Sequence, residues 1–385
     1  MENLLFLSAH WPSEKSRQAG QKTAYRNLCW LAERYVVHLV TFRSEGDREA
    51  AIWPLNQLCA QTTIFEVDFA TRLRGLFANP LLPLTIVARS SMGVRLRIRE
   101  LLATQNIRRV HFEWSQLAQY VDECPTVQHR TLYVHDVLSQ SAERSAKRKG
   151  GWFRRLEAKR VAIWEQKTYP KLTRLFVPSA KDASLLGADV QSRIRILPLY
   201  FDLYKSMVPR DFQGVLRLLF WGALRRSENV EGARWLCSKV APLLRAIGIP
   251  FEIVIAGSNP PRDIESMRSP DIEVTGFIAN PAEVFGRAHL AVLPLLEGAG
   301  VKVKVLECLA SGLPVLTTYI GGEGIEADEE DGLFILPSDP AKFTAAVAHF
   351  SRNRSLLSRL SLAAMAWGSG QDRDLRNILI DESER

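Results

Sequence analysis

The sequence predicts an α/β protein made of two doubly wound domains, each with a mostly parallel sheet covered by helices on both faces. Two observations carry this prediction. Short apolar or β-branched runs alternate with longer helical patterns, and the alternation stops near the middle of the chain and then restarts. Parallel neighbours can be joined only through crossover connections, so the alternation indicates βαβ units. At 385 residues the chain is also too long for one ordinary core.

Seven strand-like runs occupy the first half, and residues 16–33 and 152–172 have helical patterns between them. The runs are NLLFLSA, VVHLVTF, TIFEVDF, RRVHFEW, TLYVHDV, RLFVPSA and IRILPLY. The second half continues with LRLLFWG, FEIVIAG, IEVTGF, LAVLPL, PVLTTY and LFILP. The sequence therefore predicts a first domain over 1–200, a linker over 201–214, a second domain over 215–365, and a helical tail over 366–385 that could pack back on the first domain.

Composition is that of a globular protein, with 46% hydrophobic and 24% charged residues. The five cysteines are far apart, with no CxxC pair and no histidines at metal-binding spacing, so we expect no bound metal and a reducing compartment. The first apolar run is only a strand long and no basic segment precedes it, unlike a signal peptide or membrane span. The sequence predicts a cytoplasmic protein whose membrane contact, if any, is peripheral.

The net charge of +8 is unevenly distributed. Residues 1–200 carry 30 Lys and Arg against 18 Asp and Glu, a difference of +12, whereas residues 201–385 carry 20 against 24, a difference of −4. We expect no nucleic-acid partner, because no recognition helix, zinc finger or aromatic RNA motif accompanies the basic half. An anionic membrane surface or an anionic acceptor fits the one-sided charge better.

The stretch EGAGVKVKVLECLASGLPVLTTYIGGEG, residues 297–324, follows a predicted strand and opens a helix. Its first part places two glycines and two lysines at the start of an otherwise apolar helix that carries one glutamate: Gly298, Gly300, Lys302, Lys304 and Glu307. Ligands of parallel sheets bind beyond the carboxyl ends of strands, where helix N-termini attract anions. The glycines would admit a ligand close to the backbone, the lysines would hold a diphosphate, and the glutamate suits the paired hydroxyls of a ribose. A nucleotide-diphosphate sugar carries all of these groups.

Several ordered motifs support this interpretation. In the second half they are LLFWGALRRSENVEGARWL, VTGFIANPAEVFGRAHLAVLPL, GAGVKVKVLECLASGLPVLTT and GGEGI; in the first half they are YVHDVLSQSAER, WEQKTYPKLTRLFVPSAKDASLL and RIRILPLYFD. Over about 216–350 the chain resembles the donor-binding domain of GT-B glycosyltransferases of the family 4 type. The resemblance implies two Rossmann-like domains facing across a cleft, a nucleotide sugar held by the second, an acceptor met by the first, retention at the anomeric carbon, and no bound metal.

The resemblance also assigns roles to residues of the donor site. Glu307 matches the glutamate that binds the nucleotide ribose, and Lys304 matches a basic residue near the diphosphate, with Lys302 beside it. The two glycines of the loop match positions whose backbone N–H groups meet the sugar. Arg225 is placed like an arginine that clamps phosphate, and Arg226 is an adjacent candidate.

Two further matches lie in the first half. His135 matches a histidine near the sugar and the reaction centre, and Gly20 lies where the family approaches the donor or acceptor with a glycine. We therefore expect the catalytic groups to be His135, Glu307 and Glu297. His135 could also be a structural histidine at a strand end, and Lys304 with Glu307 could form an ordinary i,i+3 ion pair.

One departure from the family pattern concerns a second glutamate. Counting back from Glu307 at the family's spacing places Ala299 at that position, and Glu297, two residues earlier, could serve only in a reshaped loop. The departure keeps open a catalytically silent partner that binds nucleotide sugar. A sugar-nucleotide epimerase of the same two-domain plan is the other alternative.

Two basic segments mix cations with aromatic and apolar side chains, as is typical of a membrane interface: 147–160 and 72–90. The candidates for contact with an anionic surface are Lys147, Arg148, Lys149, Trp152, Phe153, Arg154 and Arg155. The alternative is a mobile acceptor loop followed by an ordinary helix.

The function expected from these features is retaining transfer of a sugar, of the hexosyltransferase type. The donor would be a nucleotide-diphosphate sugar and the acceptor a hydroxyl of a glycan or glycolipid, in cell-surface polysaccharide synthesis and without a cofactor. Cations and helix N–H groups would hold the leaving diphosphate while the acceptor attacks from the same face. No Ser/His/Asp or Cys/His arrangement suggests a covalent nucleophile.

Overall fold

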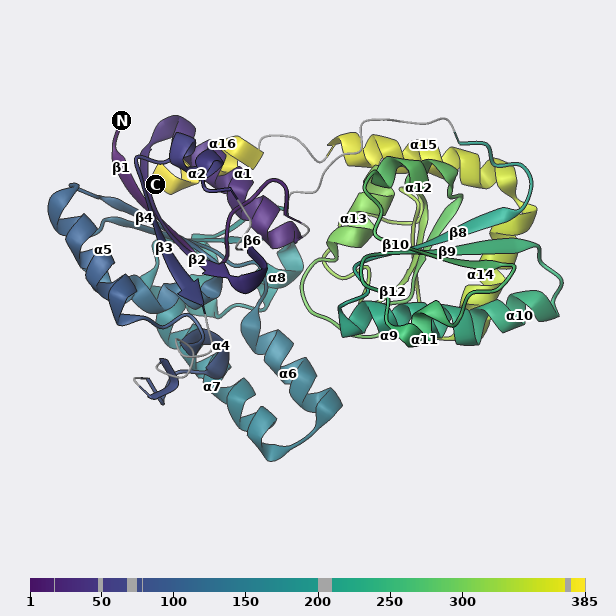
Figure 1. Cartoon of the computed structure of the whole chain (residues 1–385), viewed down its shortest axis with the longest axis horizontal. Coiled ribbons are helices and arrows are strands. Elements are labelled where there is room, and N and C mark those ends of the chain that lie inside the picture. Colours follow the sequence, from purple (N-terminus) through teal and green to yellow (C-terminus); the bar gives the residue numbers. More distant parts are fainter. Residues whose placement is uncertain are drawn as a thin grey trace. The chain divides into compact units, whose positions relative to one another are not determined.

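The computed structural model describes residues 1–16, 18–47, 51–67, 75–77, 79–199, 210–370 and 375–384. They form two compact units, Met1–Tyr200 with Asp374–Arg385, called here the N-terminal domain, and Phe201–Arg373, the C-terminal domain (Figure 1). Residues 201–209 of the expected linker lie outside the described residues. So do residues 72–74 and 78 of the basic segment 72–90.

The N-terminal domain is built on a seven-stranded sheet with the order β3-β2-β1-β4-β5-β6-β7, in which every neighbouring pair is parallel. The strands are β1 (Asn3–Ser8), β2 (Val36–Ser44), β3 (Gln61–Val67), β4 (Arg109–Glu113), β5 (His129–Tyr133), β6 (Arg174–Val177) and β7 (Ile194–Ile196). Each overlaps one of the predicted runs. The chain order reverses between β1 and β4, which is the switch point of this sheet.

Helices cover the faces of this sheet (Figure 1). They are α1 (Ala19–Arg34), α2 (Trp53–Leu58), α4 (Leu84–Val87), α5 (Met92–Thr104), α6 (Leu138–Lys149), α7 (Trp152–Thr168), α8 (Ala180–Ser184) and α16 (Leu375–Glu384), with 3-10 turns at Glu45–Asp47, Ser115–Glu123, Tyr169–Lys171 and Ala188–Arg193. The expected helix over 152–172 is α7 followed by the third of these turns. The helices α6 and α7 form a hairpin whose reversal depends on Gly150 and Gly151, at φ 66° and 92°.

The last described helix belongs to the domain that begins the chain. Helix α16 packs on α1. Leu379 is fully buried, and Arg376 Nε donates to Glu33 Oε2 at 2.8 Å. Residues distant in sequence thus complete one face of the N-terminal domain.

The C-terminal domain has a six-stranded sheet with the order β10-β9-β8-β11-β12-β13, again parallel throughout. The strands are β8 (Leu216–Trp221), β9 (Phe251–Ala256), β10 (Ile272–Gly276), β11 (Leu290–Leu293), β12 (Val315–Thr318) and β13 (Leu333–Leu336). Buried apolar residues dominate them because helices cover both faces of a parallel sheet. The predicted pair of doubly wound domains is confirmed.

Helices lie on both sides of the second sheet, with α9, α10 and α11 on one side in Figure 1 and α12, α13 and α15 on the other. They are α9 (Ser227–Trp235), α10 (Ala241–Ala246), α11 (Arg262–Glu265), α12 (Pro281–Arg287), α13 (Val303–Ala310), α14 (Pro340–Arg352) and α15 (Arg354–Gly370), and a π-helical turn at Leu236–Val240 joins α9 to α10. Among the described residues, no helix is both long and apolar enough to cross a membrane.

Candidate functional site

The expected donor-binding residues lie on two loops that meet at the middle of the C-terminal sheet. Strands β8 and β11 are paired neighbours although β9 and β10 separate them in the chain, so the strand order reverses between them. The loop after β8 leads to α9, and the loop after β11 leads to α13. Ligands of open α/β sheets bind in the crevice at such a reversal. The structure therefore brings Arg225 and Arg226 to the same end of the sheet as residues 297–307.

The loop after β11 depends on two glycines in the left-handed region, Gly298 at φ 132° and Gly300 at φ 67°. A Cβ at position 298 would lie 3.0 Å from Cε of Lys302. The Lys302 side chain is buried, and its Nζ donates to the carbonyl of Ala299 at 3.0 Å and to that of Gly300. The sequence suggested Lys302 for the diphosphate. In the structure its ammonium group binds backbone carbonyls of the loop itself.

Lys304, the second residue of α13, connects the two loops. Its Nζ donates to Oδ1 of Asn229 on α9, and Nδ2 of Asn229 donates to the carbonyl of Ala223 at 2.8 Å. Burial lowers the pKa of Lys304 to about 8; the Glu228 carboxylate opposes this effect, and Arg226 adds to it. The helix therefore carries a largely buried ammonium group next to a loop that ends with two arginines, Arg225 and Arg226.

Glu307 lies one turn further along α13 and accepts a hydrogen bond from Nε1 of Trp221, the last residue of β8, at 2.8 Å. Lys304 and Glu307 thus each have a hydrogen-bond partner on the β8 side of the site, Asn229 and Trp221. Trp221 and Asn229 were not among the expected site residues. The only sequence signal for Trp221 was an aromatic donor between a buried strand and a glycine.

Three charged side chains line the turns that precede the helices. Arg225 and Arg226 are exposed, and Nη1 of Arg226 lies 3.7 Å from Oε1 of Glu228. Within the part of the chain that the structure describes, Arg225 forms no ion pair or hydrogen bond. Glu297 accepts from Oγ of Ser227 at 3.3 Å, which connects the β11 loop to the start of α9.

In the N-terminal domain the structure brings Gly20 and His135 together at the carboxyl end of the sheet. Gly20 is the second residue of α1, and His135 follows β5. A Cβ at position 20 would lie 3.6 Å from Nδ1 of His135 and 3.2 Å from Cζ2 of Trp114. The Trp114 indole stacks on the His135 ring with centroids 4.2 Å apart and planes 13° apart.

A buried carboxylate lies behind His135. Nε2 of His135 donates to Oε1 of Glu113 at 2.6 Å, and Glu113 is fully buried at the end of β4. Trp114, the next residue, also contacts His10, with ring centroids 4.8 Å apart. Burial, with the nearby Arg89 guanidinium, lowers the pKa of His10 to about 3. Glu113, Trp114 and His10 were not expected as site residues. The available signal was the glutamate near the end of the otherwise strand-like run RRVHFEW.

The basic segment after β5 forms the α6–α7 hairpin, and Figure 1 shows it extending from the body of its domain. Trp152 is 77% exposed and Phe153 is 47% exposed at the start of α7. The segment before α4 is attached alongside: Nη2 of Arg160 donates to the carbonyls of Pro80 and Leu82, both at 2.7 Å. We call these exposed aromatic, apolar and basic side chains the hairpin surface; its members are Phe77, Leu81, Lys147, Arg148, Lys149, Trp152, Phe153, Arg154, Arg155 and Leu156.

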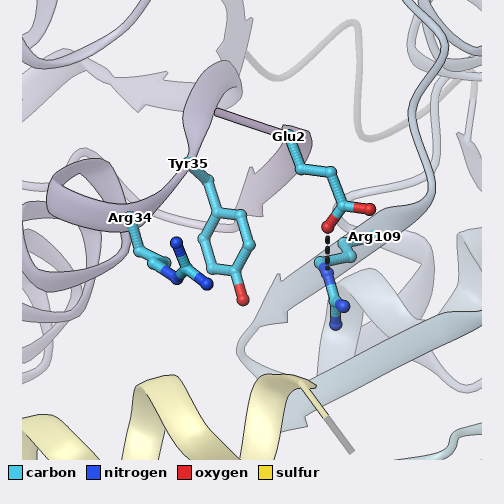
Figure 2. A pocket seen from close by; sticks show the side chains of 4 residues that line it. All are labelled: Glu2, Arg34, Tyr35 and Arg109. Carbon is cyan, nitrogen blue, oxygen red and sulfur yellow. Dashed lines mark hydrogen bonds and ion pairs between the residues drawn. The ribbon is translucent and has the colours of Figure 1, made fainter.

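A separate pocket of about 380 Å³ lies at the amino-terminal edge of the first sheet, and Glu2, Arg34, Tyr35 and Arg109 line it (Figure 2). Nε of Arg109 donates to Oε2 of Glu2 at 2.8 Å, and this hydrogen bond lowers the pKa of the glutamate. The pocket lies at the start of β1 and β4, whereas His135 and Gly20 lie at the carboxyl end of the sheet. None of the expected site residues lines it.

Comparison with known proteins agrees with this geometry. Residues 216–353 match the family model described as glycosyl transferases group 1. An uncharacterized protein of the cps region of Klebsiella pneumoniae is 24% identical over 159 residues, which is 39% of this chain and 41% of that protein.

Two solved structures show the likeness of the whole fold. Sucrose-phosphate synthase from Thermosynechococcus elongatus has a TM-score of 0.70 at 13% identity, covering 100% of this chain and 98% of that one. HepE of Anabaena in complex with UDP-glucose has a TM-score of 0.63 at 11% identity, covering 100% and 99%. The chain thus has the GT-B fold, and its residues 216–353 are similar to the glycosyl transferases group 1 family.

Proposed function

We propose that the chain transfers a sugar from a nucleotide-diphosphate donor to a hydroxyl of a glycan or glycolipid, with retention at the anomeric carbon. The observation that carries the proposal is the convergence of Arg225, Lys304 and Glu307 with a positive-φ glycine loop at the switch point of the C-terminal sheet. Cations and the N–H groups of a helix N-terminus suit a diphosphate, and a carboxylate beside them suits a ribose diol.

In this proposal Glu307 binds the ribose hydroxyls, and the Trp221 indole fixes one of its oxygens. Arg225, Arg226 and Lys304 bind the diphosphate together with N–H groups of the glycine loop. The acceptor hydroxyl forms the new C–O bond at the anomeric carbon, on the face from which the nucleoside diphosphate departs, and its proton passes to the departing phosphate. Positioning and stabilisation of the leaving charge supply the catalysis.

Two comparisons support the donor and acceptor classes. HepE was solved in complex with UDP-glucose, so a uridine nucleotide sugar is the first donor to test. The relative from Klebsiella pneumoniae is named for a cps region, which supports a polysaccharide or its lipid-linked precursor as acceptor.

Calorimetry of the full chain against nucleoside diphosphates and their sugars tests donor binding, and product analysis with a glycan acceptor then tests transfer. Transfer with retained configuration supports the proposal. Release of free nucleotide with an epimerised sugar and no acceptor would replace it with the epimerase. Tight binding without any turnover would favour the silent partner that Ala299 leaves open.

We also propose that the hairpin surface docks the N-terminal domain on an anionic lipid surface. Trp152 and Phe153 are exposed beside basic side chains, which matches a headgroup region that takes both aromatic rings and cations. Each Lys or Arg near such a surface contributes about 1 kcal/mol, so five cations suffice for reversible binding. This would place the protein at the inner face of a membrane, beside a lipid-linked acceptor.

Liposome sedimentation tests the docking. The wild type is expected to pellet with anionic vesicles, to be released by salt, and to lose binding when Lys147, Arg148, Lys149, Arg154 and Arg155 become glutamine. Equal recovery with neutral vesicles, or unchanged binding of the fivefold variant, would contradict the proposal.

A further inference from the structure

Glu113 is a fully buried carboxylate that neither the sequence motifs nor the family match assigns to a role. Its oxygens accept from Nε2 of His135 at 2.6 Å, from Nε2 of His111 at 3.0 Å and from Nδ2 of Asn27 at 3.2 Å. Burying a carboxylate is costly unless it is paired and hydrogen-bonded. Burial by itself would raise the pKa of Glu113, but the hydrogen bonds from the two histidines hold it at about 2. Glu113 is therefore ionised and can only accept hydrogen bonds.

The two histidines that donate to this carboxylate differ in the partner of their second ring nitrogen, Nδ1. His111 lies two residues before Glu113 on the same face of β4, and its Nδ1 is already paired with Oγ1 of Thr131 at 2.8 Å. His135 uses Nε2 for Glu113, and no hydrogen bond of its Nδ1 occurs among the described residues. Nδ1 instead faces the place where Gly20 lacks a side chain. His111 is thus internal to the fold, whereas His135 keeps one nitrogen for a ligand.

The plane of the His135 ring is also fixed. Trp114 stacks on one face at 4.2 Å, and Tyr133 meets the ring edge-on with centroids 4.7 Å apart. Trp114 has φ 75°, which is rare for a bulky residue and persists only where surrounding contacts hold the backbone. The stack sets the orientation of the imidazole, and the carboxylate sets which of its nitrogens carries the proton.

We propose that Glu113 is a positioning residue that holds His135 in the Nε2–H tautomer and so presents Nδ1 as a hydrogen-bond acceptor for a sugar hydroxyl. Glu113 acts through His135 and does not itself touch the sugar. The inference rests on the proposed transferase function for its ligand, but the tautomer it requires is a property of the protein alone.

The first test therefore needs no substrate. Nitrogen-15 spectra of the full chain labelled at histidine distinguish the two neutral tautomers, and His135→Gln assigns the signal. The wild type is expected to show Nε2–H at His135. Glu113→Gln offers one acceptor oxygen and one NH2 group, itself a donor, to three donor side chains, so it is expected to shift His135 partly or wholly to Nδ1–H. Glu113→Asp, which keeps the charge, is expected to retain Nε2–H.

The second test measures transfer. Loss of the carboxylate that orients a metal-bound histidine typically costs about 10- to 100-fold. We expect a loss of the same order here, so Glu113→Gln should lower kcat by about that factor with little change in donor KM, and Glu113→Asp should recover much of it. His111→Gln is the matched control: it alters the same buried cluster, so it should lower the temperature of unfolding while leaving the His135 tautomer and kcat close to wild type.

The outcomes separate the two proposals. Nδ1–H in the wild type, or an unchanged tautomer and kcat in folded Glu113→Gln, would overturn the positioning role. If Glu113→Gln does not fold, the wild-type spectrum and the Asp variant decide in the same way. A wild type that shows Nε2–H but transfers no sugar would overturn the proposed function and leave the tautomer assignment intact.

Discussion

The two domains share one plan, but their candidate sites are built from different parts of it. In the C-terminal domain the charged groups lie on two loops and on the first turns of α9 and α13. Arg225 and Arg226, on the loop before α9, are exposed. In the N-terminal domain Glu113 ends a strand and is completely buried, and it accepts a hydrogen bond from His135, whose ring stacks on Trp114. A loop site of this kind is suited to binding charge, whereas a strand-end site fixes the geometry of one ring. Changes in the first should therefore alter ligand affinity, and changes in the second should alter turnover.

The largest expected effect tests the binding half of this contrast. Arg225→Ala combined with Lys304→Met should weaken binding of a nucleoside diphosphate by about 100-fold or more, because hydrogen bonds to charged groups contribute about 1.5–3 kcal/mol each. Binding of the corresponding nucleoside should change much less, as calorimetry can show. Lys239→Met, which alters an exposed lysine just after α9, is the control. Equal losses for both ligands would place the two cations away from the phosphates.

Glu307→Ala comes next, with an expected loss of about 10- to 100-fold in nucleotide affinity, because the hydrogen bonds to the ribose disappear. Trp221→Phe is the matched variant: it removes only the N–H donor that orients Glu307, so a smaller loss is expected. Both are measured by calorimetry, with circular dichroism to confirm folding. Unchanged affinity in folded Glu307→Ala would contradict the ribose assignment.

Affinity for a nucleoside diphosphate should fall about tenfold as the pH is raised through the pKa of Lys304. The pKa of Lys304 is about 8 in the folded protein against an ordinary 10.5, so the ammonium is lost as pH rises from about 7 to 9. Phosphates titrate near pH 6, below this window, so affinity for the nucleoside diphosphate should fall there, and Lys304→Met should abolish the step. The free energy of unfolding should change with pH in the opposite direction. Between about pH 8 and 10.5 the unfolded chain binds more protons at this lysine than the folded chain does, so stability rises with pH. A flat affinity profile in the wild type would argue against contact with Lys304.

The smallest expected effect sharpens the other half of the comparison. Gly20→Ala places a methyl group 3.2 Å from Trp114 and 3.6 Å from Nδ1 of His135. Turnover should fall a few-fold while nucleotide affinity stays unchanged. Stability should change little, because alanine is favoured over glycine in a helix by about 1 kcal/mol but the 3.2 Å contact forces Trp114 to shift. Steady-state kinetics and thermal unfolding measure the two; a parallel loss of nucleotide affinity would blur the distinction between the domains.

The sheets could be predicted from the sequence because parallel strands covered on both faces are nearly continuous apolar runs. Every strand overlaps a predicted run, although β3 begins at Gln61, before the apolar part of TIFEVDF. The switch-point loops could also be predicted, since glycines, lysines and a glutamate follow a strand and open a helix.

The partners of the site residues could not be predicted. Lys302 and Lys304 look alike in sequence, and only the left-handed turn at Gly298 and Gly300 directs Lys302 inward to the loop carbonyls. Glu113 is visible as a charge in a strand, but its pairing with His135 depends on the register of β4 against β5, where Glu113 lies opposite Tyr133.

Helix α16 has a consequence for how the chain is made. It belongs to the N-terminal domain, yet Phe201–Arg373 is synthesised before it. While a ribosome is translating that stretch, the surface of α1 on which α16 later packs is still uncovered. The domain that emerges first is thus the last to be completed, so its apolar surface is open to chaperones, or to a second nascent chain, for the whole time in which the C-terminal domain is being made.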